Sequence, residues 1–145
     1  MVELDKLRTL SARVGADPLL VQAAGGNTSL KENGVMWIKA SGTWLKDAAQ
    51  RDIFVPLDHN AILDALAKDD PACESCTAFV RTDLNSTGLR PSIETTVHAL
   101  MPQAVVVHVH CVNTLAWAIR TDGEARLKER LAGFEWAFIP YARPG

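Results

Sequence analysis

Two histidines separated by one residue, His108-Val109-His110, carry the clearest chemical signal in the chain. They lie in a valine-rich stretch, residues 104–112, whose composition predicts a β-strand. Side chains two positions apart on a strand project from the same face, so the two imidazoles suit two ligands of one divalent ion. A hydrogen-bonded pair of core histidines is the alternative. Because burying two imidazoles without a shared partner is costly, we favour the metal site.

Glu94 is the candidate acid/base beside these histidines. A helix over residues 93–101, capped by Ser92, places Glu94 in its first turn, where an ordinary glutamate is also stabilised by the helix dipole. The short connection to strand 104–112 folds the helix back against the histidines and favours the catalytic interpretation. His98 shares a helical face with Glu94, so it either holds Glu94 by a hydrogen bond or packs as a half-buried side chain.

Three glycine- and hydroxyl-containing segments predict a pocket for a phosphate or carboxylate group. Glycine lets backbone amides approach an anion, and hydroxyl groups add further donors. Each segment alone is more often a simple turn, but one of them adjoins the proposed carboxylate. The segments are Gly25-Gly26-Asn27-Thr28, Ser41-Gly42-Thr43 and the helix start at Ser92.

The cysteines allow a different metal site. Cys73 and Cys76 have zinc-like spacing and would form a structural site together with His108 and His110. The chain has no second Cys-X-X-Cys pair, so this is the minor alternative. Cys111 points away from the histidines and is expected in the core. An odd cysteine count, with no leader-like pattern at the start, favours a reducing cytoplasm.

Composition favours one globular domain over residues 1–145. Hydrophobic residues make up 48% of the chain and charged residues 22%, which is a globular balance. The net charge of −2 gives no sign of nucleic-acid binding or of attachment to an anionic membrane. No apolar run approaches the ~20 residues that span a bilayer. The chain stops directly after an apolar, strand-like stretch, so we expect a domain that lacks its C-terminal part.

Helices mixed with a hairpin predict helices that cover a largely antiparallel sheet. Asn33-Gly34 between two strand-like segments is a strong hairpin signal. Residues 104–112 are apolar on both faces, which predicts a strand near the middle of the sheet. The expected helices are 3–14, 59–68, 93–101, 114–120 and 124–131, and the expected strands are 28–31, 35–40, 53–57, 77–83, 104–112 and 135–140.

Four motifs in this order resemble those of the class II aldolase/adducin family. They are Gly-Gly-Asn-Thr-Ser (25–29), Ala-Ser-Gly-Thr (40–43), Pro-Ser-Ile-Glu (91–94) and His-Val-His (108–110), and Phe138–Gly145 resembles a later segment. The family includes fuculose-phosphate and rhamnulose-phosphate aldolases and ribulose-phosphate 4-epimerase. The resemblance runs from about residue 20 to the end of the chain. It implies an α/β fold, a three-layer αβα sandwich with a largely antiparallel central sheet.

The resemblance also assigns roles to individual residues. His108 and His110 would bind a divalent metal, most often zinc, with manganese or cobalt as alternatives, and Glu94 would move a proton. The family's third ligand would follow residue 145, no tyrosine donor matches within 121–131, and Ile93 replaces a frequent serine. The residues that would hold the substrate phosphate are Gly26, Asn27, Ser41, Gly42 and Ser92.

The resulting functional expectation is a metal-dependent, aldolase-type lyase. It would cleave or form a carbon–carbon bond in a sugar phosphate or related hydroxy-ketone through an enediolate. The resemblance implies a small-molecule substrate and a cytoplasmic homo-oligomer, commonly a tetramer. A ribulose-phosphate 4-epimerase-like isomerase and a non-catalytic, adducin-like interaction module are the alternatives.

Overall fold

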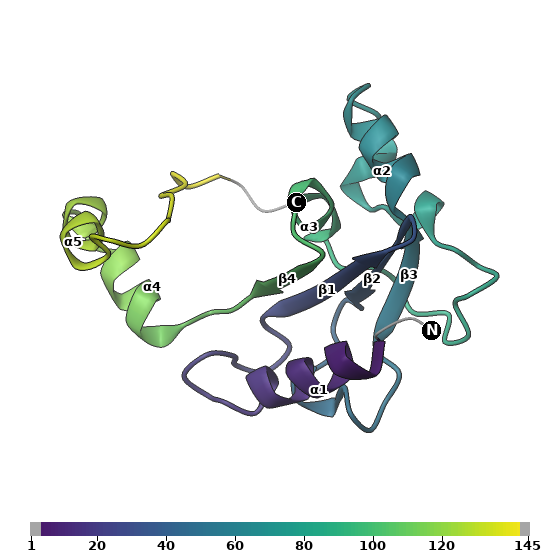
Figure 1. Cartoon of the computed structure of the whole chain (residues 1–145), viewed down its shortest axis with the longest axis horizontal. Coiled ribbons are helices and arrows are strands. Elements are labelled where there is room, and N and C mark those ends of the chain that lie inside the picture. Colours follow the sequence, from purple (N-terminus) through teal and green to yellow (C-terminus); the bar gives the residue numbers. More distant parts are fainter. Residues whose placement is uncertain (1–3, 143–145) are drawn as a thin grey trace.

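A four-stranded antiparallel sheet forms the centre of the molecule (Figure 1). The structure is a computed structural model that describes residues 4–142. The strands occur in the spatial order β3-β2-β1-β4, so the α/β fold with an antiparallel sheet is confirmed. Their bounds are Asn27–Glu32 for β1, Val35–Lys39 for β2, Phe54–Asp58 for β3 and Val105–His108 for β4.

The β1–β2 hairpin forms where the sequence predicts it. Asn33 and Gly34 both have positive φ angles, 53° and 77°, as a two-residue hairpin turn of matching twist requires. This turn sets the register, with Glu32 opposite Val35. The register then fixes which side chains of both strands face each helical layer.

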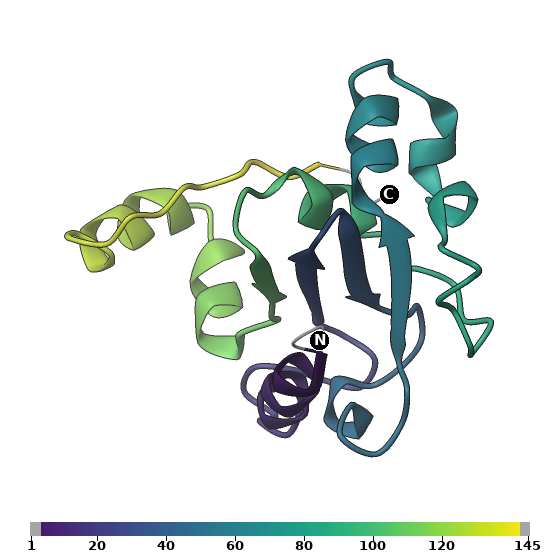
Figure 2. The ribbon, with the colours of Figure 1, turned by 45° about the vertical axis from the view of Figure 1, so that its right-hand side comes forward.

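Helices cover both faces of the sheet (Figures 1 and 2). Helix α1 (Leu4–Gly15) packs with Leu7 against Leu30 and Phe54, whereas α2 (His59–Leu66) packs with Ile62 on the opposite face. Helix α3 (Thr95–Leu100) adds Ala99 to the α2 side. Helix α1 corresponds to the helix predicted over residues 3–14, of which residue 3 lies outside the described residues. The α2-side core consists of Met36, Ile38, Ala40, Val55, Leu57, Ile62, Cys76 and Ala99.

The predicted strand over residues 77–83 does not form. Two 3-10 turns, Pro71–Glu74 and Thr77–Phe79, occupy this region, and one isolated bridge joins Leu57 to Val80. Val80 N donates to Thr77 O within the turn, and Arg81 N donates to Pro56 O of β3, so this region contacts β3 at one point instead of pairing along a strand. The apolar run that suggested a strand instead packs its Phe79 side chain against the core.

Strand β4 is shorter and more exposed than the sequence predicts. It covers four residues of the expected 104–112 and lies at an edge of the sheet, not in the middle. Val105 and Val107 are 43% and 42% exposed. The valine-rich pattern shows that both faces favour burial, but it does not reveal whether a second strand lies alongside.

The C-terminal helices α4 (Val112–Ala118) and α5 (Gly123–Arg130) pack against each other and extend away from the sheet (Figure 1). They match the helices predicted over 114–120 and 124–131. The strand predicted over 135–140 is not formed, because residues 135–142 have no strand partner. No helix in the described part of the chain is long and apolar enough to cross a membrane.

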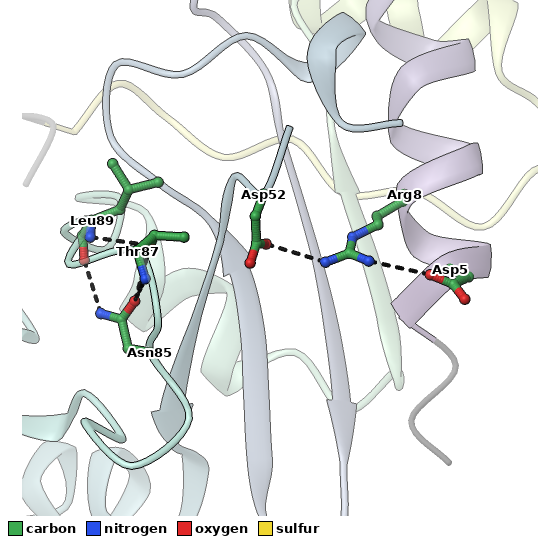
Figure 3. Close-up of polar contacts among 6 residues, drawn as sticks. All are labelled: Asp5, Arg8, Asp52, Asn85, Thr87 and Leu89. Atoms are coloured by element: carbon green, nitrogen blue, oxygen red, sulfur yellow. Dashed lines mark hydrogen bonds and ion pairs between the residues drawn. The ribbon is translucent and has the colours of Figure 1, made fainter. Parts of the chain in front are cut away.

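Polar contacts secure two surface connections (Figure 3). Arg8 on α1 lies 3.2 Å from Asp5 and 3.3 Å from Asp52, which joins the helix to the approach to β3. Asn85 accepts from the amide of Thr87 and donates to Leu89 O, so its side chain organises the loop 85–90. That loop leads into the segment that carries Ser92 and Glu94.

Candidate functional site

A carboxylate–imidazole pair lies where α3 meets β4. Glu94 Oε1 is 2.9 Å from His108 Nδ1, and both side chains are partly exposed. Glu94 occupies the position before α3 rather than its first turn, because the helix begins at Thr95. Ser92 does not cap the helix: its Oγ accepts from the amide of Glu94 at 3.3 Å, and its carbonyl accepts from Thr95 Oγ1 at 2.6 Å. These bonds fix the turn that presents Glu94 to His108.

The pair stabilises the ionised carboxylate. Partial burial acts to raise the pKa of Glu94, but the hydrogen bond and charge of His108 outweigh it, and the pKa lies below its usual value. The pKa of His108 is raised, first by its hydrogen bond to Glu94 and against the effect of burial. At neutral pH Glu94 is therefore ionised and able to accept a proton.

His108 and His110 lie next to each other, with ring centroids 4.9 Å apart and a T-shaped arrangement. Strand β4 ends at His108, so strand alternation is not what holds His110 in place. His110 N donates to Leu20 O at 2.8 Å, which keeps the chain alongside the loop before β1. The sequence prediction that the two imidazoles are neighbours agrees with this geometry.

Asn27 is the third side chain beside Glu94 and His108, and its buried amide lacks a well-formed hydrogen bond. Asn27 stands opposite His108 in the β1–β4 register and is 1% exposed. Neither its Oδ1 nor its Nδ2 makes a well-formed hydrogen bond within the described residues, although a weak hydrogen bond from Asn27 helps to lower the pKa of Glu94. Because an unpaired buried amide is costly, it points to a polar ligand as a partner.

The donor types at this site fit a divalent ion, although the set of protein ligands is partial. Imidazole nitrogen and carboxylate oxygen are ligands that zinc accepts. In residues 4–142 no three or more His, Cys, Asp and Glu side chains converge as a metal site. The Cys₂His₂ alternative is thereby excluded. Cys76 is instead buried in the α2-side core, and burial raises the pKa of its thiol to about 11.

The three segments predicted to bind an anion come together around Lys39. Its Nζ donates to Ala24 O at 3.1 Å and to Thr43 O at 2.8 Å, which joins the loop before β1 to the loop after β2. A bridge between Ala40 and Pro91 adds the segment that carries Ser92. Gly26 and Gly42 have φ angles of +68° and +75°, a conformation that favours glycine.

The sequence analysis did not single out Lys39. Its side chain is 3% exposed, and burial lowers the pKa of its ammonium group while the charge of Glu94 acts to raise it. The sequence does contain a signal for its burial. Lys39 lies near the end of the otherwise apolar segment 35–40, directly before Ala40-Ser41-Gly42. Lysine is rarely this buried unless its ammonium group is paired, so a lysine inside an apolar segment indicates a specific polar environment.

His98 does not contact Glu94 by a hydrogen bond, which corrects one of the two interpretations of this residue. Its Nδ1 bonds to Ser29 Oγ on β1 at 2.8 Å, and the side chain is 1% exposed. Burial lowers the pKa of His98 to about 4. The remaining interpretation, a packing residue of α3, agrees with this position, and the burial is deeper than expected.

The buried His98 predicts acid sensitivity. Because its pKa is lower in the folded than in the unfolded protein, the unfolded state binds more protons between about pH 6.5 and 4, and stability falls as the pH decreases. The free energy of unfolding falls by about 3 kcal/mol over this pH window. Urea denaturation at pH 7 and 4.5 measures it. His98→Asn should flatten the pH dependence of the free energy of unfolding, and an unchanged pH dependence in this variant would contradict the prediction.

Gly25 predicts a steric effect on His110. A Cβ at this position would lie 2.9 Å from both Gln22 O and His110 Nδ1. Gly25→Ala should therefore destabilise the fold by about 1–3 kcal/mol and shift the NMR signals of the His110 ring. At Gly42 a Cβ meets no atom within 4 Å, so Gly42→Ala strains only the local backbone, whose φ is +75°, and should leave those signals in place. Unchanged His110 signals in Gly25→Ala would refute the packing argument.

A cavity of about 420 Å³ opens beside the carboxylate–imidazole pair. Glu94 and His108 contribute its polar groups, and α3 and β4 supply most of its apolar lining. The lining residues are Glu94, Val97, His98, Met101, Val106, Val107, His108 and Val109. The cavity is large enough for a small metabolite.

A family model and a solved structure indicate the same family. A model described as "Class II Aldolase and Adducin N-terminal domain" matches residues 9–145. The "Uncharacterized oxidoreductase YuxG" of Bacillus subtilis (strain 168) is 29% identical over 152 residues, which cover 98% of this chain and 22% of that protein. The N-terminal class II aldolase domain of a conserved protein from Thermoplasma acidophilum aligns with a TM-score of 0.71 and 27% identity. That alignment covers 89% of this chain and 64% of the other, so this chain spans only part of both relatives.

Proposed function

Because the chain belongs to the class II aldolase and adducin N-terminal domain family, we propose that it acts as a metal-dependent, aldolase-type lyase domain. Its reaction cleaves or forms a carbon–carbon bond in a sugar phosphate or a related hydroxy-ketone. The observation that carries this proposal is the ionised Glu94 carboxylate 2.9 Å from His108, with His110 alongside. This arrangement places a proton acceptor and the His108 ring at one cavity, with the His110 ring next to His108 as a second candidate nitrogen ligand.

His108 and His110 would hold the metal, with zinc as the proposed ion and manganese or cobalt as alternatives. A divalent ion bound there supplies Lewis-acid stabilisation of the negative charge on an enediolate. The Glu94–His108 hydrogen bond supports the role of His108. When Nδ1–H donates to the carboxylate, Nε2 keeps the lone pair that a ligand needs, and the carboxylate makes the imidazole more basic.

Glu94 would move the proton at the reacting carbon. Retro-aldol cleavage leaves a carbanion-like carbon that must be protonated, and the reverse reaction begins by removing that proton. Glu94 is held at the cavity by the turn at Ser92, with a lowered pKa that keeps it ionised. The carboxylate therefore takes the proton in one direction and returns it in the other.

The loops joined by Lys39 would bind the substrate phosphate. Backbone amides and hydroxyl groups of such loops bind anions, and binding of a remote phosphate helps to position the reacting atoms. Ser41 N already donates to Arg90 O, so its hydroxyl is the group that remains for an anion. The proposed binding residues are Gly26, Asn27, Ser41, Gly42 and Ser92.

Proton exchange tests this proposal without knowledge of the aldehyde partner. The zinc-loaded protein is incubated with dihydroxyacetone phosphate in D₂O, and loss of a hydroxymethyl proton signal is followed by NMR. We expect stereospecific exchange, faster than for dihydroxyacetone, which lacks the phosphate. Absence of exchange in the zinc-, manganese- and cobalt-loaded protein would overturn the enzyme proposal.

Two other functions are alternatives to this proposal. A ribulose-phosphate 4-epimerase-like reaction would use nearly the same residues, and it is distinguished by an epimerised rather than a cleaved product. An adducin-like, non-catalytic module does not need Glu94, His108 and His110 together, so their proximity favours the enzyme. The oxidoreductase activity in the name of the Bacillus relative concerns a protein of which this chain spans 22%.

We further propose a cytoplasmic homo-oligomer, tetrameric as in the family members that the sequence resembles. The cysteines Cys73, Cys76 and Cys111 are all free thiols, which suits a reducing compartment. Sedimentation analysis of the purified chain would measure the oligomeric state, and a monomer at micromolar concentration would contradict the tetramer.

A further inference from the structure

His98 lines the same cavity as Glu94 and His108, although its side chain is only 1% exposed. Among the residues that line this cavity, these three carry titratable groups and the others are valine or methionine. His98 N donates to Glu94 O at 3.1 Å, so one helical turn separates the two residues. Side chains at this spacing lie on the same helical face, so a molecule that meets Glu94 in the cavity is also close to the His98 ring.

One ring nitrogen of His98 is bound to the sheet, and the other has no partner. Nδ1 lies 2.8 Å from the Oγ atom of Ser29 on β1, a residue that is 0% exposed. Nε2 makes no hydrogen bond within residues 4–142. Buried polar atoms of side chains are generally paired. Because the ring lines the cavity, Nε2 is the nitrogen that a molecule in the cavity can bind.

Ser29 determines which nitrogen of the neutral His98 ring carries the proton. The Ser29 hydroxyl has no other hydrogen-bond partner in the described part of the chain, so its proton is directed at Nδ1. A neutral imidazole that accepts at Nδ1 carries its proton on Nε2. Burial lowers the pKa of His98 to about 4, so the ring is neutral at pH 7. His98 therefore offers an uncharged N–H donor at the cavity.

We propose that His98 is a further catalytic residue, whose Nε2–H donates a hydrogen bond to a carbonyl oxygen of the substrate in this cavity. The inference rests on the proposed lyase function, because the acceptor is the substrate of that reaction. When Glu94 takes the proton from the carbon, the electron pair of the broken C–H bond moves towards the neighbouring carbonyl. Negative charge develops on the carbonyl oxygen, and a fixed donor stabilises it. The Nε2 proton stays on His98, as in other enzymes that polarise a carbonyl with a neutral imidazole.

Helix packing alone does not explain an imidazole at this position. It accounts for the burial of the ring and for the bond to Ser29, but an aliphatic side chain would fill the same space without an unpaired polar nitrogen. His59 provides the contrast. It also contacts α3, but its Nε2 is paired with Ala99 O at 3.0 Å, and the residue does not line the cavity. His59 is therefore the matched control for a histidine that only packs.

Ring nitrogen NMR of the ¹⁵N-histidine-labelled 145-residue chain tests the donor without turnover. In the metal-free protein at pH 7 we expect a neutral His98 ring with its proton on Nε2. Saturating dihydroxyacetone phosphate, added to the zinc-loaded protein, should move the Nε2–H signal downfield, as entry into a hydrogen bond does. A proton on Nδ1 would overturn the proposal. So would an Nε2–H signal that stays in place in protein that exchanges the substrate proton.

Replacing His98 by leucine removes the donor from a side chain of similar size. We expect proton exchange into saturating dihydroxyacetone phosphate to slow by about 10²–10³-fold, the usual loss for one donor to a developing oxyanion, with a smaller change in KM. His98→Gln keeps an N–H donor near the position of Nε2 and should recover part of the rate. His59→Leu should keep the unmodified rate. Urea denaturation confirms that each variant is folded under the assay conditions.

The rates separate this proposal from the proposed function. Exchange at the unmodified rate in His98→Leu would overturn the role of His98 and leave the lyase function in place. Equal losses in His98→Leu and His59→Leu would also overturn it, because both would then reflect the packing of α3. Absence of exchange in the unmodified, metal-loaded protein would overturn the lyase function, and the role of His98 together with it. If His98→Leu does not fold, the ring NMR of the unmodified chain decides.

Discussion

Replacing Glu94 by glutamine is expected to slow proton exchange into dihydroxyacetone phosphate by about 10²–10⁴-fold, the usual contribution of a positioned acid/base. Glutamine keeps the size and hydrogen-bonding capacity of the side chain but does not accept the proton. The turn held by Ser92 uses the main chain of residue 94, so the substitution should leave the loop in place. The exchange rate by NMR and the bound zinc by atomic absorption are measured on the same sample.

Glu74→Gln is the matched control, because Glu74 lies on the surface in the turn Pro71–Glu74, outside the site. It should exchange protons at the unmodified rate. If Glu94→Gln also retains that rate, Glu94 is not the proton carrier. If Glu94→Gln loses its zinc, Glu94 serves mainly to hold the metal, and the assignment of its role must change.

Replacing His108 or His110 by alanine is expected to lower zinc affinity by at least about 100-fold. Loss of an outer partner of a ligand already costs about 10–100-fold, and loss of a ligand costs more. Affinity in the unmodified chain should also fall as the pH is lowered, because zinc competes with protons for imidazole and Glu94 raises the pKa of His108. Isothermal titration calorimetry with zinc chloride measures both effects.

His59→Ala is the matched control for zinc binding. The His59 ring is half-buried at the start of α2 and bonds to Ala99 O at 3.0 Å, so it belongs to the helix packing rather than to the site. Zinc affinity should be unchanged in this variant. Equal losses in all three alanine variants would indicate nonspecific binding to histidine, and no loss in any of them would remove His108 and His110 from the metal site.

The parts of the fold that the sequence predicts are those set by local geometry. Asn33 and Gly34 determine the hairpin because both take positive φ angles, and the hairpin determines the register of β1 and β2. Asp58 caps α2 by accepting from the amide of Ala61. The Glu94–His108 contact follows from the short connection between α3 and β4, which leaves the chain few ways to turn.

The parts that the sequence does not predict depend on distant partners. His98 forms a hydrogen bond with Ser29, which lies 69 positions earlier in the chain. No local sequence pattern distinguishes this hydrogen bond from one to Glu94. The valines of β4 have the same pattern at an edge as in the middle of a sheet. Lys39 is buried because two loops and the β2 end meet around it, and only the tertiary structure shows that meeting.

Lys39 bears on how the side chains of the proposed anion-binding loops can change. The hydrogen bonds of its Nζ within the described residues end on main-chain carbonyls, those of Ala24, Ala40 and Thr43. Every amino acid carries such a carbonyl, so the framework does not depend on which side chains the two loops bear. Loop side chains are therefore free to vary between related enzymes, or in a designed library, while the loops keep their relative positions.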